Sequence, residues 1–291
     1  MPRLARGHAA GPWRLNPLNY RHAFHAGNFA DVFKHAVLAR ILLYLGNKDA
    51  PFRVIDTHAG AGRYDLSDNK AERTSEWKDG IGRLLADPPT GEAGDLLAPY
   101  LSAAQAEPGR YPGSPLIALR LTRPQDRLVF CELHPEERAA LNAAVGRDRR
   151  ASVVETDGWT ALKAALPPLE RRGLVLIDPP FEDGGDFRRL EDGLREGHRR
   201  WPSGIYLFWY PIMDAHEVEA FGRRIARLGI PKILRAELTV GDLAVGKLAS
   251  CGLLLGNPPW TLAGELERIM PALARLLGKS GSARYRLSWL T

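Results

Sequence analysis

The chain has 291 residues, of which 45% are hydrophobic and 25% charged, as in a soluble globular protein that can bury a full core. No apolar run reaches the ~18 residues of a membrane-spanning helix, and two cysteines are too few for a disulfide scaffold, which favours buried free thiols in a cytoplasmic protein. Forty Lys and Arg residues against 34 Asp and Glu give a net charge of +6, which favours a polyanionic partner, although a compositional bias toward arginine explains it equally well.

The first 17 residues lack the apolar stretch of a secretory signal, and we predict that they form a disordered extension. Tyr20, Arg21 and His22 follow, and an aromatic beside cationic and hydrogen-bonding groups suits contact with nucleic acid better than burial. The alternative is that Tyr20 packs on the core. His22 and His25 have helical spacing, but no carboxylate or cysteine accompanies them at metal-ligand spacing, so we expect no metal site.

Residues 29–46 (FADVFKHAVLARILLYLG) have apolar residues at helical spacing. They predict an amphipathic helix that anchors the preceding segment. Lys34 and His35, on this helix, are expected to lie near the functional site.

From Phe52 onward, short apolar runs alternate with segments of helical periodicity, which is typical of a parallel sheet covered on both faces. The predicted strands are residues 52–56, 127–133, 152–156, 173–178, 204–210, 232–238 and 251–257. We therefore expect an α/β fold of the doubly wound, Rossmann-like kind, with seven mostly parallel strands. Ligands of such folds bind at the carboxyl ends of the strands.

About 70 residues separate the first two predicted strands, too many for one crossover helix. Residues 65–110 contain two helical patterns and predict a small inserted helical subdomain. The main domain would then consist of residues 18–64 and 111–291.

Three strand ends suggest a cofactor that contains adenosine. The first predicted strand runs into Gly60-Ala61-Gly62, where missing side chains allow close approach of a ligand. The second ends at Glu132, placed to accept the hydroxyls of a ribose. The third ends at Asp157-Gly158, where an acid can accept an adenine amine, although it can equally cap the next helix.

The fourth predicted strand ends in Asp178-Pro179-Pro180-Phe181. Asp178 and a neighbouring carbonyl can accept the two N–H groups of an adenine amine, and this readies a poor nucleophile for attack on a sulfonium methyl. Pro179 stiffens the turn and provides no competing N–H. Phe181 offers a face for an extruded base, worth about 1–3 kcal/mol. The alternative is an ordinary strand-ending turn.

Two similar tetrapeptides occur elsewhere. Residues 87–90 (DPPT) lack the aromatic and follow a helical pattern, so we interpret them as a loop. Residues 257–260 (NPPW) fit the amino-methylating pattern but follow the seventh strand, far from the expected methyl donor. We therefore favour residues 178–181.

Several segments carry a recognisable family likeness. They are NYRHAFHAGNFADVFKH (19–35), DTHAGAGRYDL (56–66), AERTSEW (71–77), YPGSPLIA (111–118), ELHP (132–135), RRGLVLIDPPFE (171–182) and GIYLFWYP (204–211). The chain resembles, from about residue 18 to its end, the bacterial 23S ribosomal RNA adenine(2030)-N6 methyltransferases. The first of these segments is far more specific than the glycine loop or the D-P-P-aromatic turn.

The resemblance implies a class I methyltransferase fold, S-adenosyl-L-methionine as methyl donor and 23S ribosomal RNA as partner. By the same resemblance, the residues that bind the donor are His35, His58, Ser114, Glu132, Asp157, Gly158 and Asp178, and the glycine loop described above adds Gly60. Asp178 also accepts the proton of the target amine, and Tyr20 contacts RNA. Phe181 stands where the family often has tyrosine, which keeps the stacking face and loses a hydroxyl. About 16 extra residues precede the family's usual start.

Other functions stay open at this stage. A nicotinamide-dependent oxidoreductase would need a third glycine in the loop and has no use for the D-P-P-F turn. A non-catalytic RNA-binding protein and an N6-adenine DNA methyltransferase are further alternatives. We expect a monomer without metal or membrane attachment. Arg21, His22, Lys34 and Phe181 are expected to contact RNA together with Tyr20.

Overall fold

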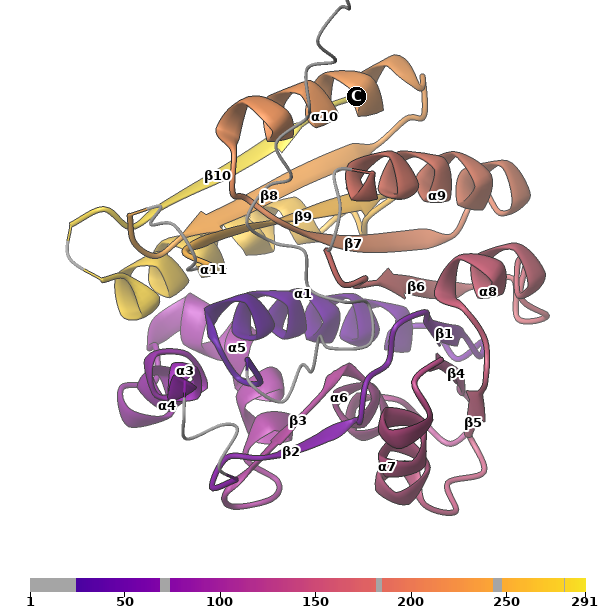
Figure 1. The fold of residues 1–291 in the computed structure, drawn as a ribbon, viewed down its shortest axis with the longest axis horizontal. Helices are drawn as coiled ribbons and strands as arrows, with labels where there is room; N and C mark the ends of the chain where they lie inside the picture. The colour runs from indigo at the N-terminus through magenta and orange to yellow at the C-terminus, as the bar shows by residue number, and fades with distance from the viewer. Residues whose placement is uncertain (1–24, 69–73, 182–184, 243–247, 280) are drawn as a thin grey trace, which may run out of the picture.

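One mixed sheet forms the centre of the computed structural model, which describes residues 25–68, 74–181, 185–242, 248–279 and 281–291 (Figure 1). Within these residues it has eight strands, in the order β10 (Arg284–Trp289), β8 (Ile233–Thr239), β9 (Ser250–Gly256), β7 (Ile205–Pro211), β6 (Gly173–Ile177), β1 (Arg53–Asp56), β4 (Arg127–Cys131) and β5 (Ala151–Val154). The strands from β7 to β5 are parallel. β9 runs antiparallel to β7 and β8, and β10 runs antiparallel to β8.

The prediction of seven strands was wrong by one, and the sheet is more mixed than expected. The missed strand, β10, has the sequence RYRLSW. Two of its six residues are arginines, and only Leu287 and Ser288 are partly buried, while the other four are exposed. Edge strands are often polar because only one side of them pairs. The α/β class is as predicted, and so is the parallel arrangement of β7, β6, β1, β4 and β5.

Helices cover both faces of the sheet (Figure 1). On one face lie α8 (Gly158–Ala164), α9 (Asp186–Arg200) and α10 (Ala215–Arg227). On the other lie α1 (Phe29–Gly46), α3 (Glu76–Asp79), α4 (Ile81–Ala86), α5 (Gly91–Ala104), α6 (Ser114–Leu121), α7 (Pro135–Val145) and α11 (Leu262–Leu277). Each face has its own hydrophobic core, which fixes the helices relative to the strand ends.

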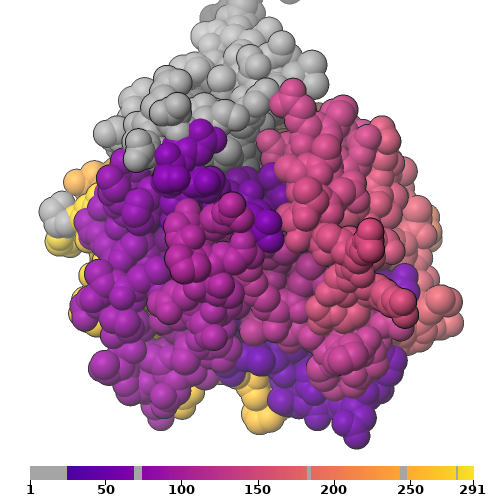
Figure 2. All heavy atoms as spheres, turned by 90° about the horizontal axis from the view of Figure 1, so that it is seen from below, coloured from indigo at the N-terminus to yellow at the C-terminus, as the bar shows by residue number. Residues whose placement is uncertain are grey.

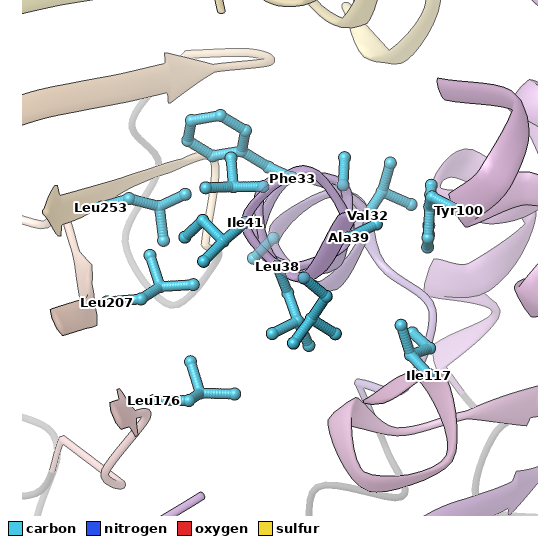
Figure 3. Close-up of a cluster of buried hydrophobic side chains, with 14 of the residues drawn as sticks. Val32, Phe33, Leu38, Ala39, Ile41, Tyr100, Ile117, Leu176, Leu207 and Leu253 are labelled. Atoms are coloured by element: carbon cyan, nitrogen blue, oxygen red, sulfur yellow. The ribbon is translucent and has the colours of Figure 1, made fainter. Parts of the chain in front are cut away.

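Helix α1 has the predicted bounds but is not amphipathic, because almost its whole circumference is buried. Phe33 and Ile41 point toward Leu253 and other leucines of the sheet, while the opposite side faces Tyr100 (Figure 3). A helix that is apolar all round belongs inside a protein. Its polar residues are therefore held in a largely dry environment.

The stretch between β1 and β4 contains a second, two-stranded sheet. β2 (Arg63–Asp65) and β3 (Arg110–Pro112) form an antiparallel two-stranded sheet. Between them, α4 and α5 contribute Leu84 and Leu97 to the core that contains α1. Figure 2 shows this side of the molecule, where segments from the first half of the chain, indigo to magenta, lie side by side. The division into a main domain and an inserted subdomain stays a prediction.

Among the described residues, no helix is both long and apolar enough to cross a membrane. Cys131 and Cys251 are buried and form no disulfide, as predicted.

Candidate active site

The edge of the sheet at which its parallel strands end, here called the carboxyl edge, gathers residues predicted from four separate strands. Gly60 follows β1, Glu132 follows β4, Asp157 follows β5 and Asp178 follows β6. The pairing of these strands, in the order β6, β1, β4 and β5, makes the four strand ends neighbours. The sequence therefore placed these residues at one site because parallel strands share a direction.

One carboxylate ties the loops after β1 and β4 together. Glu132 accepts hydrogen bonds from the backbone N–H of Gly60 (2.8 Å to Oε2) and of His134 (2.8 Å to Oε1). Gly60 has φ +61°, and a Cβ there would lie 2.5 Å from the Tyr64 hydroxyl, so this approach requires glycine. Leu133 is 59% exposed. The two loops thus present an oriented carboxylate beside an apolar surface.

Asp157 serves as the N-cap of α8. Its Oδ2 accepts hydrogen bonds from the Thr160 backbone N–H (2.9 Å) and from the Thr160 hydroxyl (3.0 Å). The capping alternative raised from the sequence therefore describes one of its oxygens. The hydrogen bonds of the cap all go to Oδ2, so the predicted contact of Asp157 with the methyl donor, through Oδ1, stays a prediction.

Gly158 makes room for His58. A Cβ at Gly158 would lie 2.6 Å from Cε1 of His58 and 2.5 Å from the Thr57 carbonyl oxygen. The His58 ring shares a hydrogen bond with the Thr57 hydroxyl (2.8 Å) and meets Trp159 edge-on at 5.7 Å. Burial lowers the pKa of His58 to about 4, so this ring is neutral at physiological pH.

Asp178 is joined to helix α1 by an ion pair with Lys34. Lys34 is 4% exposed, and its ammonium also lies 2.9 Å from Asp31, one turn earlier on the helix. Asp31 in turn accepts the backbone N–H of Gly27 (2.9 Å). Burial opposes the charge of Lys34, but the two carboxylates outweigh it and raise the pKa of this amine above its usual value.

His35 lies behind this ion-pair network rather than on the surface. It is 1% exposed, and its Nδ1 is 2.7 Å from the Tyr111 hydroxyl, which is 3.1 Å from the Tyr100 hydroxyl. Its Nε2 lies 4.0 Å from Asp31. A buried chain of polar groups thus runs from Asp31 through His35 and Tyr111 to Tyr100 on helix α5.

Ser114 is buried too and supports the end of β1. Its hydroxyl donates to Asp56 Oδ2 at 2.6 Å, and the backbone N–H of His58 donates to Asp56 Oδ1 at 3.3 Å. Burial raises the pKa of Asp56 to about 6, and the Ser114 hydrogen bond partly offsets this. Ser114 therefore acts on the glycine loop through Asp56.

The D-P-P-F turn is anchored by its aromatic residue. Phe181 meets Phe187 (5.3 Å) and Trp209 (5.9 Å) edge-on. Pro179 is buried and Pro180 is exposed. These T-shaped contacts hold the Phe181 ring in place.

Sequence reasoning missed Asp31, Asp56 and Leu133. The spacing of Asp31, Lys34 and His35, three and four residues apart on one helix, was a signal that an acid faces both of the other side chains. Asp56 was visible as an acid at the end of an apolar strand. Leu133 had no signal, because an exposed leucine is ordinary on a protein surface.

Both look-alike turns lie away from this site. Residues 87–90 connect α4 to α5, as expected for a loop. Residues 257–260 follow β9, whose last residue pairs with Tyr206 and Ile233 near the starts of β7 and β8. They therefore lie at the opposite edge of the sheet.

Some predictions concern segments outside the described residues. The N-terminal extension (1–17) and the RNA-contacting Tyr20, Arg21 and His22 fall there, so they stay predictions. His25 is described, and its Nδ1 lies 3.1 Å from Glu76 on α3. Within the described ranges no three His, Cys, Asp or Glu side chains are grouped so as to hold a metal ion.

Comparison with known proteins identifies relatives along nearly the whole chain. A family model described as "Ribosomal RNA large subunit methyltransferase D, RlmJ" matches residues 49–291. The protein named "Ribosomal RNA large subunit methyltransferase J" from Escherichia coli (strain K12) is 41% identical over 282 residues, covering 94% of this chain and 99% of that protein. Its namesake from Haemophilus influenzae is 41% identical over 278 residues, with the same shares.

A solved structure gives the same result for the fold. The crystal structure of a Legionella pneumophila protein superimposes with a TM-score of 0.82 at 34% sequence identity. The superposition covers 91% of this chain and 98% of that one.

Proposed function

Because the chain belongs to the RlmJ family of ribosomal RNA large subunit methyltransferases, we propose that it transfers a methyl group from S-adenosylmethionine to N6 of an adenine in 23S ribosomal RNA. Transfer of a methyl group to large-subunit ribosomal RNA is the activity that its relatives' names state. The resemblance to the adenine(2030)-N6 enzymes supports the choice of base. Action as a monomer in the cytoplasm is part of the same proposal.

The observation that carries the proposal is the D-P-P-F turn at the carboxyl edge, with Asp178 held by Lys34. The ion pair occupies one oxygen of Asp178 and leaves the other for an N–H of the target amine. A carbonyl of the turn can take the second N–H, because Pro179 and Pro180 have no N–H groups to compete. With both N–H groups engaged, the nitrogen lone pair is directed at the methyl group.

The methyl donor supplies, when bound, a methyl group on a positively charged sulfur. The charges of Asp31, Lys34 and Asp178 sum to −1, so the network does not repel that sulfur. As the N–C bond forms, the C–S bond breaks and its electron pair stays on sulfur. The nitrogen then carries positive charge and readily gives one proton to Asp178, for which a weak base suffices.

The residues after β1, β4 and β5 fit the rest of the donor. Glu132 is already oriented by two backbone N–H groups, and its remaining lone pairs suit ribose hydroxyls. Leu133 offers an apolar surface to the adenine ring. Gly60 permits the tight turn of this loop, because a Cβ there would collide with the Tyr64 hydroxyl. Asp157 can accept the ring amine through the oxygen that does not cap α8.

Two predicted donor contacts act indirectly in this scheme. His35 and Ser114 are buried and reach the site through Asp31 and Asp56. Lys34 was predicted to contact RNA, and its place between two carboxylates favours a role in orienting Asp178. Contact with RNA by Tyr20, Arg21, His22 and Phe181 stays part of the proposal.

Methyl transfer from labelled donor to ribosomal RNA from a strain that lacks the activity tests this function. The wild-type protein should label 23S RNA at one adenine, found by mapping the modified base, and Asp178→Asn should label none. Equal or better labelling of duplex DNA would favour the DNA methyltransferase alternative. Binding of RNA without any transfer would favour a non-catalytic role.

A further inference from the structure

The edge of the sheet opposite the proposed active site, here called the amino edge, is strongly cationic. Residues 47–53, 121–127, 146–151 and 167–173 precede or begin β1, β4, β5 and β6, and they contain nine Lys and Arg but four Asp and Glu. Their net charge of +5 nearly equals the +6 of the whole chain. The excess positive charge of the protein is thus concentrated where the proposed methyl transfer does not take place.

These four segments form one continuous surface. Arg53 donates its backbone N–H to the Arg172 carbonyl (2.9 Å), and Arg127 donates its own to the Phe52 carbonyl (3.0 Å). Leu128 donates to the Arg150 carbonyl at 2.9 Å. The arginines before four adjacent strands therefore lie side by side, although up to 119 positions separate them in sequence.

Part of this charge has a structural role. Arg53 pairs with Glu170 (2.9 Å), Arg123 with Asp126 (3.0 Å) and Arg150 with Asp148 (2.6 Å). These ion pairs engage three of the four acids of the surface. They stabilise loops and leave the remaining cations uncompensated.

Three arginines, Arg147, Arg149 and Arg171, have no such role, and neither has Lys48. All three arginines are exposed, and none has a carboxylate within ion-pair distance in the parts of the chain that the structure describes. Three uncompensated guanidinium groups on one edge produce a positive field that attracts phosphates.

We propose that this amino-edge surface binds the phosphate backbone of the ribosomal RNA at a distance from the target adenine. The inference rests on the proposed function for the identity of the polyanion. β6, with five residues, separates the two edges by about 16 Å. An RNA that presents its adenine at the carboxyl edge must extend around the protein to reach the amino edge, so only a long substrate makes the second contact.

The test is a triple variant, Arg147→Gln, Arg149→Gln and Arg171→Gln, measured on two RNAs. One is a hairpin just large enough to contain the target adenine, and the other is a folded fragment of 23S RNA around it. Loss of about three phosphate contacts should lower the slope of log affinity against log salt by roughly 2 to 3 for the long RNA. Its KM should rise about tenfold at low salt, with kcat unchanged and the hairpin unaffected.

A matched control removes the same charge elsewhere. Arg195, Arg268 and Arg275 on α9 and α11 are equally exposed, but each is paired with a carboxylate. Their combined replacement by glutamine should leave the salt slope as in the wild type. If the two triple variants bind the long RNA alike, the amino-edge surface does not contact RNA and the proposal fails.

Two further outcomes are distinguishable. Affinities are measured without donor, so a protein that binds RNA but transfers no methyl group would overturn the proposed function and still test this surface. Cosedimentation with phosphatidylserine vesicles tests whether the amino-edge surface binds a membrane instead of RNA. Vesicle binding that the amino-edge variant loses, with RNA affinity unchanged, would identify a membrane-facing surface and overturn the proposal.

Discussion

Two turns of this chain have nearly the same sequence and lie at opposite edges of one sheet. Residues 178–181 (DPPF) follow the parallel strand β6 and lie at the carboxyl edge. Residues 257–260 (NPPW) follow β9, which runs the other way between β7 and β8 and so ends at the amino edge. The direction of the preceding strand alone places one turn at the site and the other far from it.

The surroundings of the two turns differ as much as their positions. Asp178 pairs with a buried lysine, and Phe181 is held edge-on by two aromatic rings. Asn257 has φ +49° and donates from its amide to the Ser203 carbonyl (3.0 Å), so it shapes a turn, while Trp260 is 82% exposed. The turn to which we assign the chemistry therefore has a paired acid and a ring held by its neighbours, and the other turn has neither.

The largest difference is expected from the two leading residues. Asp178→Ala should lower kcat at least 100-fold, because a group that takes part in proton transfer contributes about 10²–10⁴. Calorimetric titration should show donor affinity within a few fold of the wild type. Asn257→Ala should leave kcat unchanged and cost about 1–2 kcal/mol of stability, since alanine tolerates positive φ poorly. Full turnover by Asp178→Ala would contradict its role in proton transfer, and Asn257 would then be the next candidate for that role.

The second-largest difference is expected between variants of the two aromatic residues, Phe181 and Trp260. Phe181→Ala should lower kcat/KM for RNA roughly 5- to 150-fold, the equivalent of about 1–3 kcal/mol of stacking. Phe181→Tyr should retain activity because it keeps the ring. Trp260→Ala should behave as the wild type. An inactive tyrosine variant would mean that the pocket excludes a hydroxyl, and stacking would then be an incomplete explanation.

Two glutamates, one at each edge of the sheet, allow the same comparison for binding of the methyl donor. Glu132→Ala should weaken binding of the donor or its demethylated product at least tenfold, because a charge-assisted hydrogen bond is worth about 1.5–3 kcal/mol. Glu170→Ala, at the amino edge and paired with Arg53, provides the control and should bind the donor normally. Equal affinities in the two variants would mean that Glu132 only fastens its loop to Gly60.

The smallest effect concerns pH. The pKa of His58 is lowered from 6.5 to about 4 by burial, so the unfolded chain takes up this proton first as pH falls. The free energy of unfolding should therefore decrease between pH 6.5 and 4, by about 2–3 kcal/mol, and His58→Asn should remove that part of the dependence.

Denaturant titrations at several pH values, with the variant subtracted from the wild type, measure this effect. The subtraction also cancels Asp56, whose pKa is raised to about 6 by burial. Its contribution is present below pH 3.8 and lost as pH rises through 6. Parallel curves for the two proteins would contradict a neutral His58 ring in the folded protein.

Local patterns were sufficient for most elements and for the residues at the strand ends. Apolar runs flanked by turns identified the five parallel strands, and Glu132, Asp157 and Asp178 are acids at the ends of such runs. β10 escaped this approach because its arginines interrupt the apolar pattern. α1 was found at its correct bounds, but its burial on all sides depends on α5 and the sheet together, which its own sequence does not specify.

Long-range pairing decided the rest. Lys34 and Asp178 are 144 positions apart, and His35 and Tyr111 are 76 apart, so no local periodicity relates them. They meet because α1 is buried against the face of the sheet over β6 and β9, where a charged side chain is stable only beside an opposite charge. The same holds for the two proline turns: their residues are written in the chain, but the direction of β9 is set by its neighbours, and that direction separates a turn at the proposed site from one that only reverses the chain.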